Sequence, residues 1–102
     1  MTHWKVLIMT PDEADLGLAL DDLQAILESK EPLHACIENF FLLHVGEVTE
    51  RGVGFGQREI GVIVDDTTAH HLFLKYFETF SAANRHGLTK IFFWPIPPRN
   101  NQ

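Results

Sequence analysis

The chain has 102 residues with 45% apolar side chains, which suits one globular domain with a single core and excludes overall disorder. Its net charge of −6 disfavours non-specific binding to nucleic acid or to anionic membranes, and no apolar run approaches the roughly 18 residues of a membrane span. The single Cys36 excludes an internal disulfide and, with no recognisable signal peptide, predicts a cytoplasmic protein.

The N-terminal part predicts a strand followed by a helix. Trp4–Met9 is an apolar run of strand length. A helix start follows, in which Thr10 is the expected N-cap and Pro11 takes the first helical position, where no amide hydrogen is needed. Pro32 is expected to end this helix near residues 29–31. Leucines at helical spacing form its apolar stripe: Leu16, Leu20, Leu23 and Leu27.

The centre of the chain predicts one long β-hairpin. Its first arm, Ile37–Val48, contains the block Phe40–Leu43, which is apolar without alternation, as in a strand that is buried on both faces. The tip, Thr49–Gln57, holds three glycines and is expected to be mobile or bulged. The return arm, Glu59–Asp65, alternates. One of its faces carries Ile60, Val62 and Val64.

The last third predicts a helix and a strand. Asp66 or Thr67 is the expected cap of the helix, and Gly87 is the expected residue just after its end. Leu88–Trp94 is predicted to be the last strand, and residues 95–102 to be a loose tail. The expected core stripe of the helix consists of Phe73, Tyr76, Phe77 and Phe80, with Leu72 and Ala83 at its edge.

The order β-α-β-β-α-β predicts an α+β ferredoxin-like plait over residues 1–102, with a four-stranded antiparallel sheet and two helices on one face. The strands carry large apolar residues on both faces, and two helices can cover only one. About six such groups would otherwise meet water, each worth about 1.5–3 kcal/mol on burial. Such a surface usually marks an interface, so the sequence predicts a homo-oligomer whose sheets pack on one another.

Three short motifs permit a comparison with known families. Residues 60–66 read as a strand that ends in Asp-Asp, Gly87 and Lys90 stand in the turn before the last strand, and residues 54–58 read Gly-Phe-Gly-Gln-Arg. These features resemble the PII signal-transduction proteins. The first half, through residues 10–13 and 35–37, is similar to the CutA proteins. Both families are trimers with inward-facing sheets, so the resemblance implies a trimer in preference to a dimer.

The resemblance implies an oligomeric protein that binds a small anionic ligand in clefts between subunits and catalyses no reaction. An adenine nucleotide is the candidate cofactor, and no metal site is expected. In this hypothesis the glycine-rich tip offers backbone amides and charge, and the turn before the last strand forms the opposite wall. The ligand-binding residues are then Arg51, Gly54, Phe55, Gly56, Arg58, Gly87 and Lys90.

Two other functions stay open at this stage. An enzyme of the oligomeric plait type would use His44 as an acid or base in an apolar pocket. An interaction module would dock on a basic partner through the acidic first helix. A metal site at His70 and His71 is disfavoured because adjacent helical residues point about 100° apart. RNA recognition through residues 51–56 is disfavoured by the acidic charge and by Val53, which stands where a stacking aromatic is needed.

Overall fold

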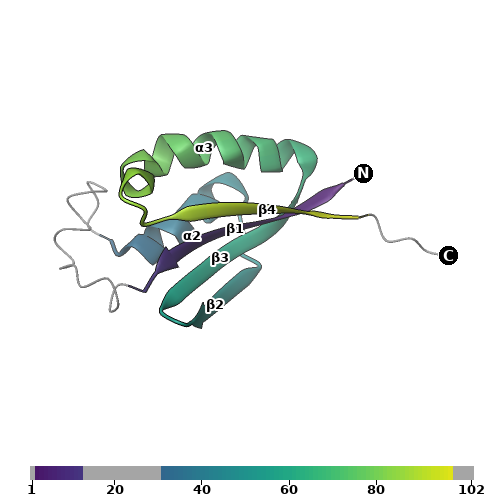
Figure 1. The fold of residues 1–102 in the computed structure, drawn as a ribbon. Helices are drawn as coiled ribbons and strands as arrows, with labels where there is room; N and C mark the ends of the chain where they lie inside the picture. The colour runs from purple at the N-terminus through teal and green to yellow at the C-terminus, as the bar shows by residue number, and fades with distance from the viewer. Residues whose placement is uncertain (1, 13–30, 98–102) are drawn as a thin grey trace.

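The computed structural model describes residues 2–12 and 31–97, which form a four-stranded antiparallel sheet and two helices (Figure 1). The elements in chain order are β1 (His3–Pro11), α2 (Leu33–His44), β2 (Glu50–Gly54), β3 (Gln57–Asp65), α3 (Asp66–Arg85) and β4 (Lys90–Ile96). The strand order β2-β3-β1-β4 is that of a ferredoxin-like plait, so the predicted fold class is confirmed. In the described part of the chain, neither helix has the length and apolar character needed to cross a membrane.

The segment predicted as the first hairpin arm is a helix. Residues 33–44 form α2, so the predicted strand over Ile37–Val48 is wrong. A short apolar block fits a doubly buried strand or a buried helix equally well. Here the helical spacing of the buried residues around the block distinguishes the helix from the strand. The predicted leucine stripe between residues 16 and 27 lies outside the described residues. The buried side chains of α2 repeat with helical period and are Leu33, Ile37, Phe40 and Phe41.

Strand β1 continues two residues beyond its predicted end at Met9, into the predicted helix start. Thr10 pairs with Arg58 and Pro11 with Gln57, so the predicted N-cap at Thr10 is wrong. Pro11 is tolerated in this central strand because it stands at the last position, where a missing N–H costs little. The backbone N–H of Asp12 then donates to the carbonyl of Gly56 at 2.7 Å. This bond ties the end of β1 to the β2–β3 turn.

The β2–β3 hairpin has a regular two-residue turn at its tip. Phe55 and Gly56 both have positive φ, at 53° and 75°, as a type I′ turn requires. The ladder runs without a bulge from Gly54 and Gln57 to Glu50 and Gly61. The predicted bulge is therefore wrong, because Gly52 and Gly54 lie inside the paired ladder and Gly56 lies in the turn. The predicted mobility of the tip stays a prediction.

Helix α3 begins earlier than predicted, so the predicted cap at Asp66 or Thr67 is wrong. Asp65 is the N-cap, and its carboxylate accepts a hydrogen bond from the backbone N–H of Thr68 at 2.8 Å, which lowers the pKa of Asp65. Gly87 follows the helix with a φ of 71°, as predicted for a residue that ends a helix. The buried face consists of Ala69, Leu72, Tyr76, Phe80 and Ala83.

Two of the predicted core aromatics of α3 lie at the margin of the core. Phe73 and Phe77 are 43% and 42% exposed. Phe73 lies over β4, which is an edge strand in the described part of the sheet, and Phe77 contacts the ring of Phe73. The ring of Phe73 contacts Phe93 of β4, with centroids 5.9 Å apart. The core stripe is therefore rotated by one residue from the predicted one.

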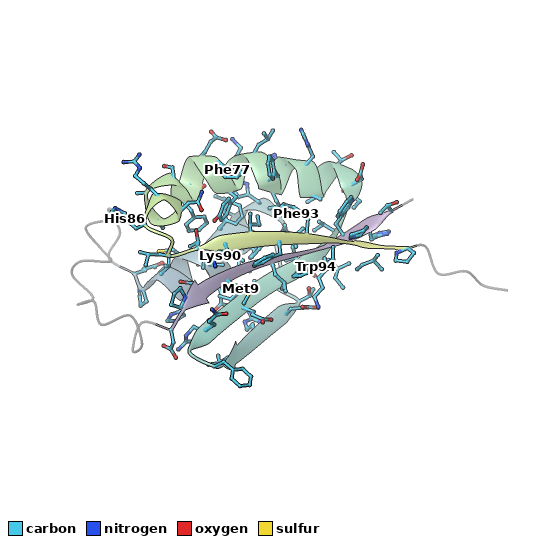
Figure 2. The ribbon with its side chains drawn as sticks, in the orientation of Figure 1. Met9, Phe77, His86, Lys90, Phe93 and Trp94 are labelled. Carbon is cyan, nitrogen blue, oxygen red and sulfur yellow. The ribbon has the colours of Figure 1, made fainter. Side chains whose placement is uncertain are left out.

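Both helices pack on one face of the sheet, and the opposite face will be called the open face. Figure 2 shows Phe93 on the α3 side of β4 and Trp94 on the other side. Among residues 2–12 and 31–97, no helix packs on the open face. Because residues 37–44 belong to α2 and not to a strand, the open face is less apolar than predicted. Its side chains, assigned by alternation and strand pairing, include Lys5, Leu7, Met9, Glu50, Glu59, Ile63, Lys90, Phe92 and Trp94, with glycines at 52, 54 and 61.

Candidate functional site

A concavity lies between the first two turns of α3 and strands β1 and β4, and will be called the α3 cavity. Its volume is about 480 Å³, and it opens to solvent. Its walls are mainly aromatic, and three polar side chains stand around one end. The lining consists of Trp4, Ala69, Phe73 and Phe93, with Asp66, Thr67 and His70 as the polar groups.

Helical spacing places the α3 residues of this cavity. Asp66, His70 and Phe73 follow one another at intervals of four and three residues, which puts a carboxylate, an imidazole and a ring on one side of the helix. Trp4 reaches the cavity from β1, and its Nε1 donates a hydrogen bond to Oδ1 of Asp66 at 2.6 Å. This bond orients the carboxylate and joins β1 to the start of α3.

The α3 cavity has the features of a small-molecule site. Such sites usually measure about 300–1,000 Å³, with mostly apolar walls and a few polar groups that orient the ligand. The aromatic rings offer flat faces to a ring or to a cation. Asp66 at one end accepts hydrogen bonds and carries negative charge, so the cavity suits a ligand whose polar end donates hydrogen bonds or is cationic.

Two of the predicted ligand-binding residues lie together at a second, smaller cavity. Gly87 and Lys90 line a hollow of about 170 Å³ at the end of the sheet. Gln57, which directly follows the β2–β3 turn, lines the same hollow. The structure thus brings the turn before β4 close to the tip of the β2–β3 hairpin within one subunit. The remaining lining residues are Met9, Thr10, Pro11, Leu88 and Phe92.

The other predicted ligand-binding residues lie elsewhere in the subunit. Arg51 donates two hydrogen bonds to Oε1 of Glu38 on α2, through Nε at 3.1 Å and Nη2 at 2.9 Å. Arg58 Nε lies 3.8 Å from a carboxylate oxygen of Asp12. Both arginines belong to the helix-covered face of the sheet, whereas Lys90 belongs to the open face. The fully exposed Phe55 occupies the tip with Gly54 and Gly56, so one subunit does not gather the seven residues into one cluster.

A histidine pair joins the end of α2 to α3. Nε2 of His71 lies 3.2 Å from Nδ1 of His44, which is hydrogen-bonding distance. Burial lowers the pKa of His44, and the neighbouring His71 lowers it further. His44 lines neither cavity, and His70 points away into the α3 cavity, as the 100° rotation between helical neighbours requires. In the described ranges, no group of three or more metal-ligating side chains occurs.

The His44–His71 pair predicts a loss of stability in mild acid. A folded-state pKa below the ordinary value of 6.5 favours the neutral imidazole in the folded protein, so its stabilising effect is present above pH 6.5 and is lost as the pH falls through the lowered pKa. Lys75 and Glu78 on α3 also face this pair, with opposite effects. We expect the melting temperature to fall more between about pH 7.5 and about pH 5.5 in the wild type than in a His44→Gln variant.

His86→Gln is the control for this titration, because His86 caps the other end of α3 and is exposed. It should keep the wild-type pH profile. Equal acid sensitivity of the wild type and His44→Gln would contradict the assigned role of His44.

Sequence reasoning missed the α3 cavity. It assigned Asp66 to capping and Phe73 to the core, and it placed Trp4 and Phe93 on separate strands without knowing that β1 and β4 are neighbours. The helical spacing of residues 66, 70 and 73 was the only available signal. Comparison of the chain with protein-family models, with curated proteins and with solved structures found no match, so the likeness to the PII and CutA proteins extends to the βαββαβ topology alone.

Proposed function

We propose that the protein binds a small aromatic molecule with a hydrogen-bond-donating or cationic end in the α3 cavity. The observation that carries this proposal is the combination of about 480 Å³ of space, three aromatic walls and a carboxylate fixed at one end. The aromatic rings of Trp4, Phe73 and Phe93 supply apolar contact. Asp66 supplies the polar contact that sets the orientation of the ligand.

The cavity favours weak binding of a minimal ligand. A single ring that enters an open cavity buries only part of its surface and loses its translational freedom, so a dissociation constant on the order of 0.1–1 mM is expected for a one-ring probe. A charge-assisted hydrogen bond to Asp66 adds about 1.5–3 kcal/mol, which corresponds to a factor of about ten or more. Charge should therefore discriminate between probes that share the same ring.

Two probes with one ring and opposite charge test the proposal. Titration with 2-phenylethylamine should perturb Trp4 and the start of α3 in a two-dimensional NMR spectrum, and phenylacetate should bind at least about tenfold more weakly because it meets Asp66 with a like charge. Asp66→Asn should bring the two affinities together. The same weak affinity for both probes in the wild type would contradict the role of Asp66.

A pair of phenylalanines on α3 provides the matched control. Phe73 and Phe77 are exposed to the same extent, at 43% and 42%, but only Phe73 lines the cavity. Phe73→Ala should weaken binding of the amine at least about fivefold, whereas Phe77→Ala should bind like the wild type. Equal effects of the two changes would place the probe outside the cavity.

The PII-like function suggested by the sequence stays a prediction. It is supported by the cavity that Gly87 and Lys90 line next to Gln57, since Lys90 gives that hollow a positive group for an anion. The clefts between subunits that the hypothesis needs involve a second copy of the chain. An enzymatic role for His44 receives less support, because His44 contacts His71 and lines neither cavity.

A further inference from the structure

The open face of the sheet has two unlike halves. The half formed by β2 and β3 carries glycines at 52, 54 and 61 and the acids Glu50 and Glu59. A Cβ added at Gly54 would meet nothing within 4 Å, and one at Gly52 would meet only Glu59, at 3.8 Å. At Gly52 and Gly54 this half is therefore low and acidic, whereas Leu7 fills the space above Gly61 and Ile63 of β3 is 43% exposed.

The half formed by β1 and β4 carries larger side chains and a cation. Phe92 and Trp94 of β4 stack with ring centroids 5.5 Å apart, and Trp94 is 45% exposed. Lys90 stands on the same strand and the same face, beside Met9 of β1. Figure 2 shows Met9, Lys90 and Trp94 along these two strands. The stacked rings form an aromatic ridge along one edge of the face.

Strand pairing defines which groups lie in the same row across the face. One row runs Gly52–Glu59–Met9–Lys90 from β2 to β4. The next runs Glu50–Gly61–Leu7–Phe92. In each row a glycine and an acid stand on the β2–β3 half, and large or basic side chains stand on the β1–β4 half. The first row is thus complementary in shape and charge, because its β2–β3 end is small and acidic and its β1–β4 end is long and basic.

We propose that two copies of the chain pack their open faces together about a two-fold axis parallel to β1 and β3. Such an axis keeps each residue at its level along the strands and exchanges the two halves, so β4 of each copy lies over β2 of the other. The aromatic ridge of each copy then lies over the β2 side of the partner, with Phe92 at the level of the partner's Glu50. Lys90 comes to lie over the partner's Gly52, beside the partner's Glu59.

The charges select this axis over the other simple arrangement. A two-fold axis perpendicular to the strands would place ridge on ridge and would bring Glu50 and Glu59 near their own copies, which like-charge repulsion disfavours. Glu50 is already held by Lys5 across β3, with Nζ 3.0 Å from Oε2. Glu59 is therefore the acid assigned to Lys90 of the second copy.

The size of the face sets the strength of the expected association. Four strands of five to nine residues give a face of about 20 Å by 25 Å. A dimer would bury about 1,000 Å² in total, which is the lower limit for a specific interface. We therefore expect monomer and dimer in equilibrium, with a dissociation constant on the order of 10–100 µM.

A charge swap tests the pairing of the two copies. Sedimentation velocity of the full chain from about 5 to about 500 µM should show dimerisation of the wild type, weakened at least about tenfold by Lys90→Glu or by Glu59→Lys alone. The double variant should return to within about threefold of the wild type, because it restores opposite charges in exchanged positions. Circular dichroism confirms that each variant is folded.

Two charge reversals on α3, equal in size to those of the test variants, serve as controls. Arg85→Glu and Glu78→Lys lie away from the open face and should dimerise like the wild type. A wild type that stays monomeric at the highest concentration would overturn the proposal. If Trp94 of that monomer were shielded from a soluble quencher, another part of the same chain would cover the open face. Single and double variants with equal affinity would also overturn it, because the contact between Lys90 and Glu59 would then be absent.

Discussion

Replacement of Gly61 by valine should prevent folding, and replacement by alanine should lower the free energy of unfolding by roughly 3 kcal/mol. Gly61 lies opposite Leu7 in the ladder between β3 and β1. A Cβ at this position would overlap the Cδ2 atom of Leu7 and the backbone carbonyl oxygen of Val6. A side chain can rotate away, but the backbone of a central strand cannot, so the two strands would have to separate.

Thermal unfolding followed by circular dichroism measures this effect. A loss of about 3 kcal/mol corresponds to a fall of about 12–24 °C in the melting temperature of a domain this size. Gly52→Ala is the control, because Gly52 lies on the same face and its added Cβ meets only Glu59, at an ordinary 3.8 Å. That variant should change stability by less than about 0.5 kcal/mol. Similar melting of the two variants would contradict the close approach of β1 and β3 at Gly61.

Phe41→Ala should lower the free energy of unfolding by about 3–5 kcal/mol, because it removes a fully buried ring and leaves a cavity. Phe41 contacts Phe40, with ring centroids 5.5 Å apart, and belongs to the core beneath α2. Leu43→Ala should change stability by less than about 0.5 kcal/mol, since Leu43 is 78% exposed. Urea unfolding of both variants gives the two values directly.

The contrast between these two positions also distinguishes a helix from a strand. Residues two apart share a face in a strand but point about 160° apart in a helix. If residues 37–48 formed a strand, Phe41 and Leu43 would be buried or exposed together, and their alanine variants would have similar effects. Unequal losses therefore support α2, and equal losses would contradict it.

The elements with one buried and one exposed face could be predicted from the sequence. β3 has a simple alternation, with Ile60, Val62 and Val64 facing the helices, so its period is easily recognised. The start of α3 has capping residues whose hydrogen bonds are local, and Asp65 and Thr68 form one of them. Residues 40–43 lack such a contrast, because two adjacent phenylalanines are buried and the two leucines after them are exposed. Four consecutive apolar residues hide that difference.

The candidate site was harder to predict than the fold, because its parts meet only through tertiary structure. Trp4 and Phe93 come from the two ends of the chain and become neighbours through the pairing of β1 with β4. His44 and His71 became a pair only because His44 ends a helix rather than standing within a strand. Local sequence patterns carry no information about either adjacency.

The two outermost strands of the sheet both discourage a further strand from adding to them. β2 has only five residues, of which two are glycines and two are charged, and such a short, polar edge is a poor template. β4 contains Pro95, which has no N–H to offer to an incoming strand. Sideways extension of the sheet into ribbons or fibres is therefore disfavoured at either border (Figure 1), and this protection should keep the protein from aggregating through its borders even at high concentration.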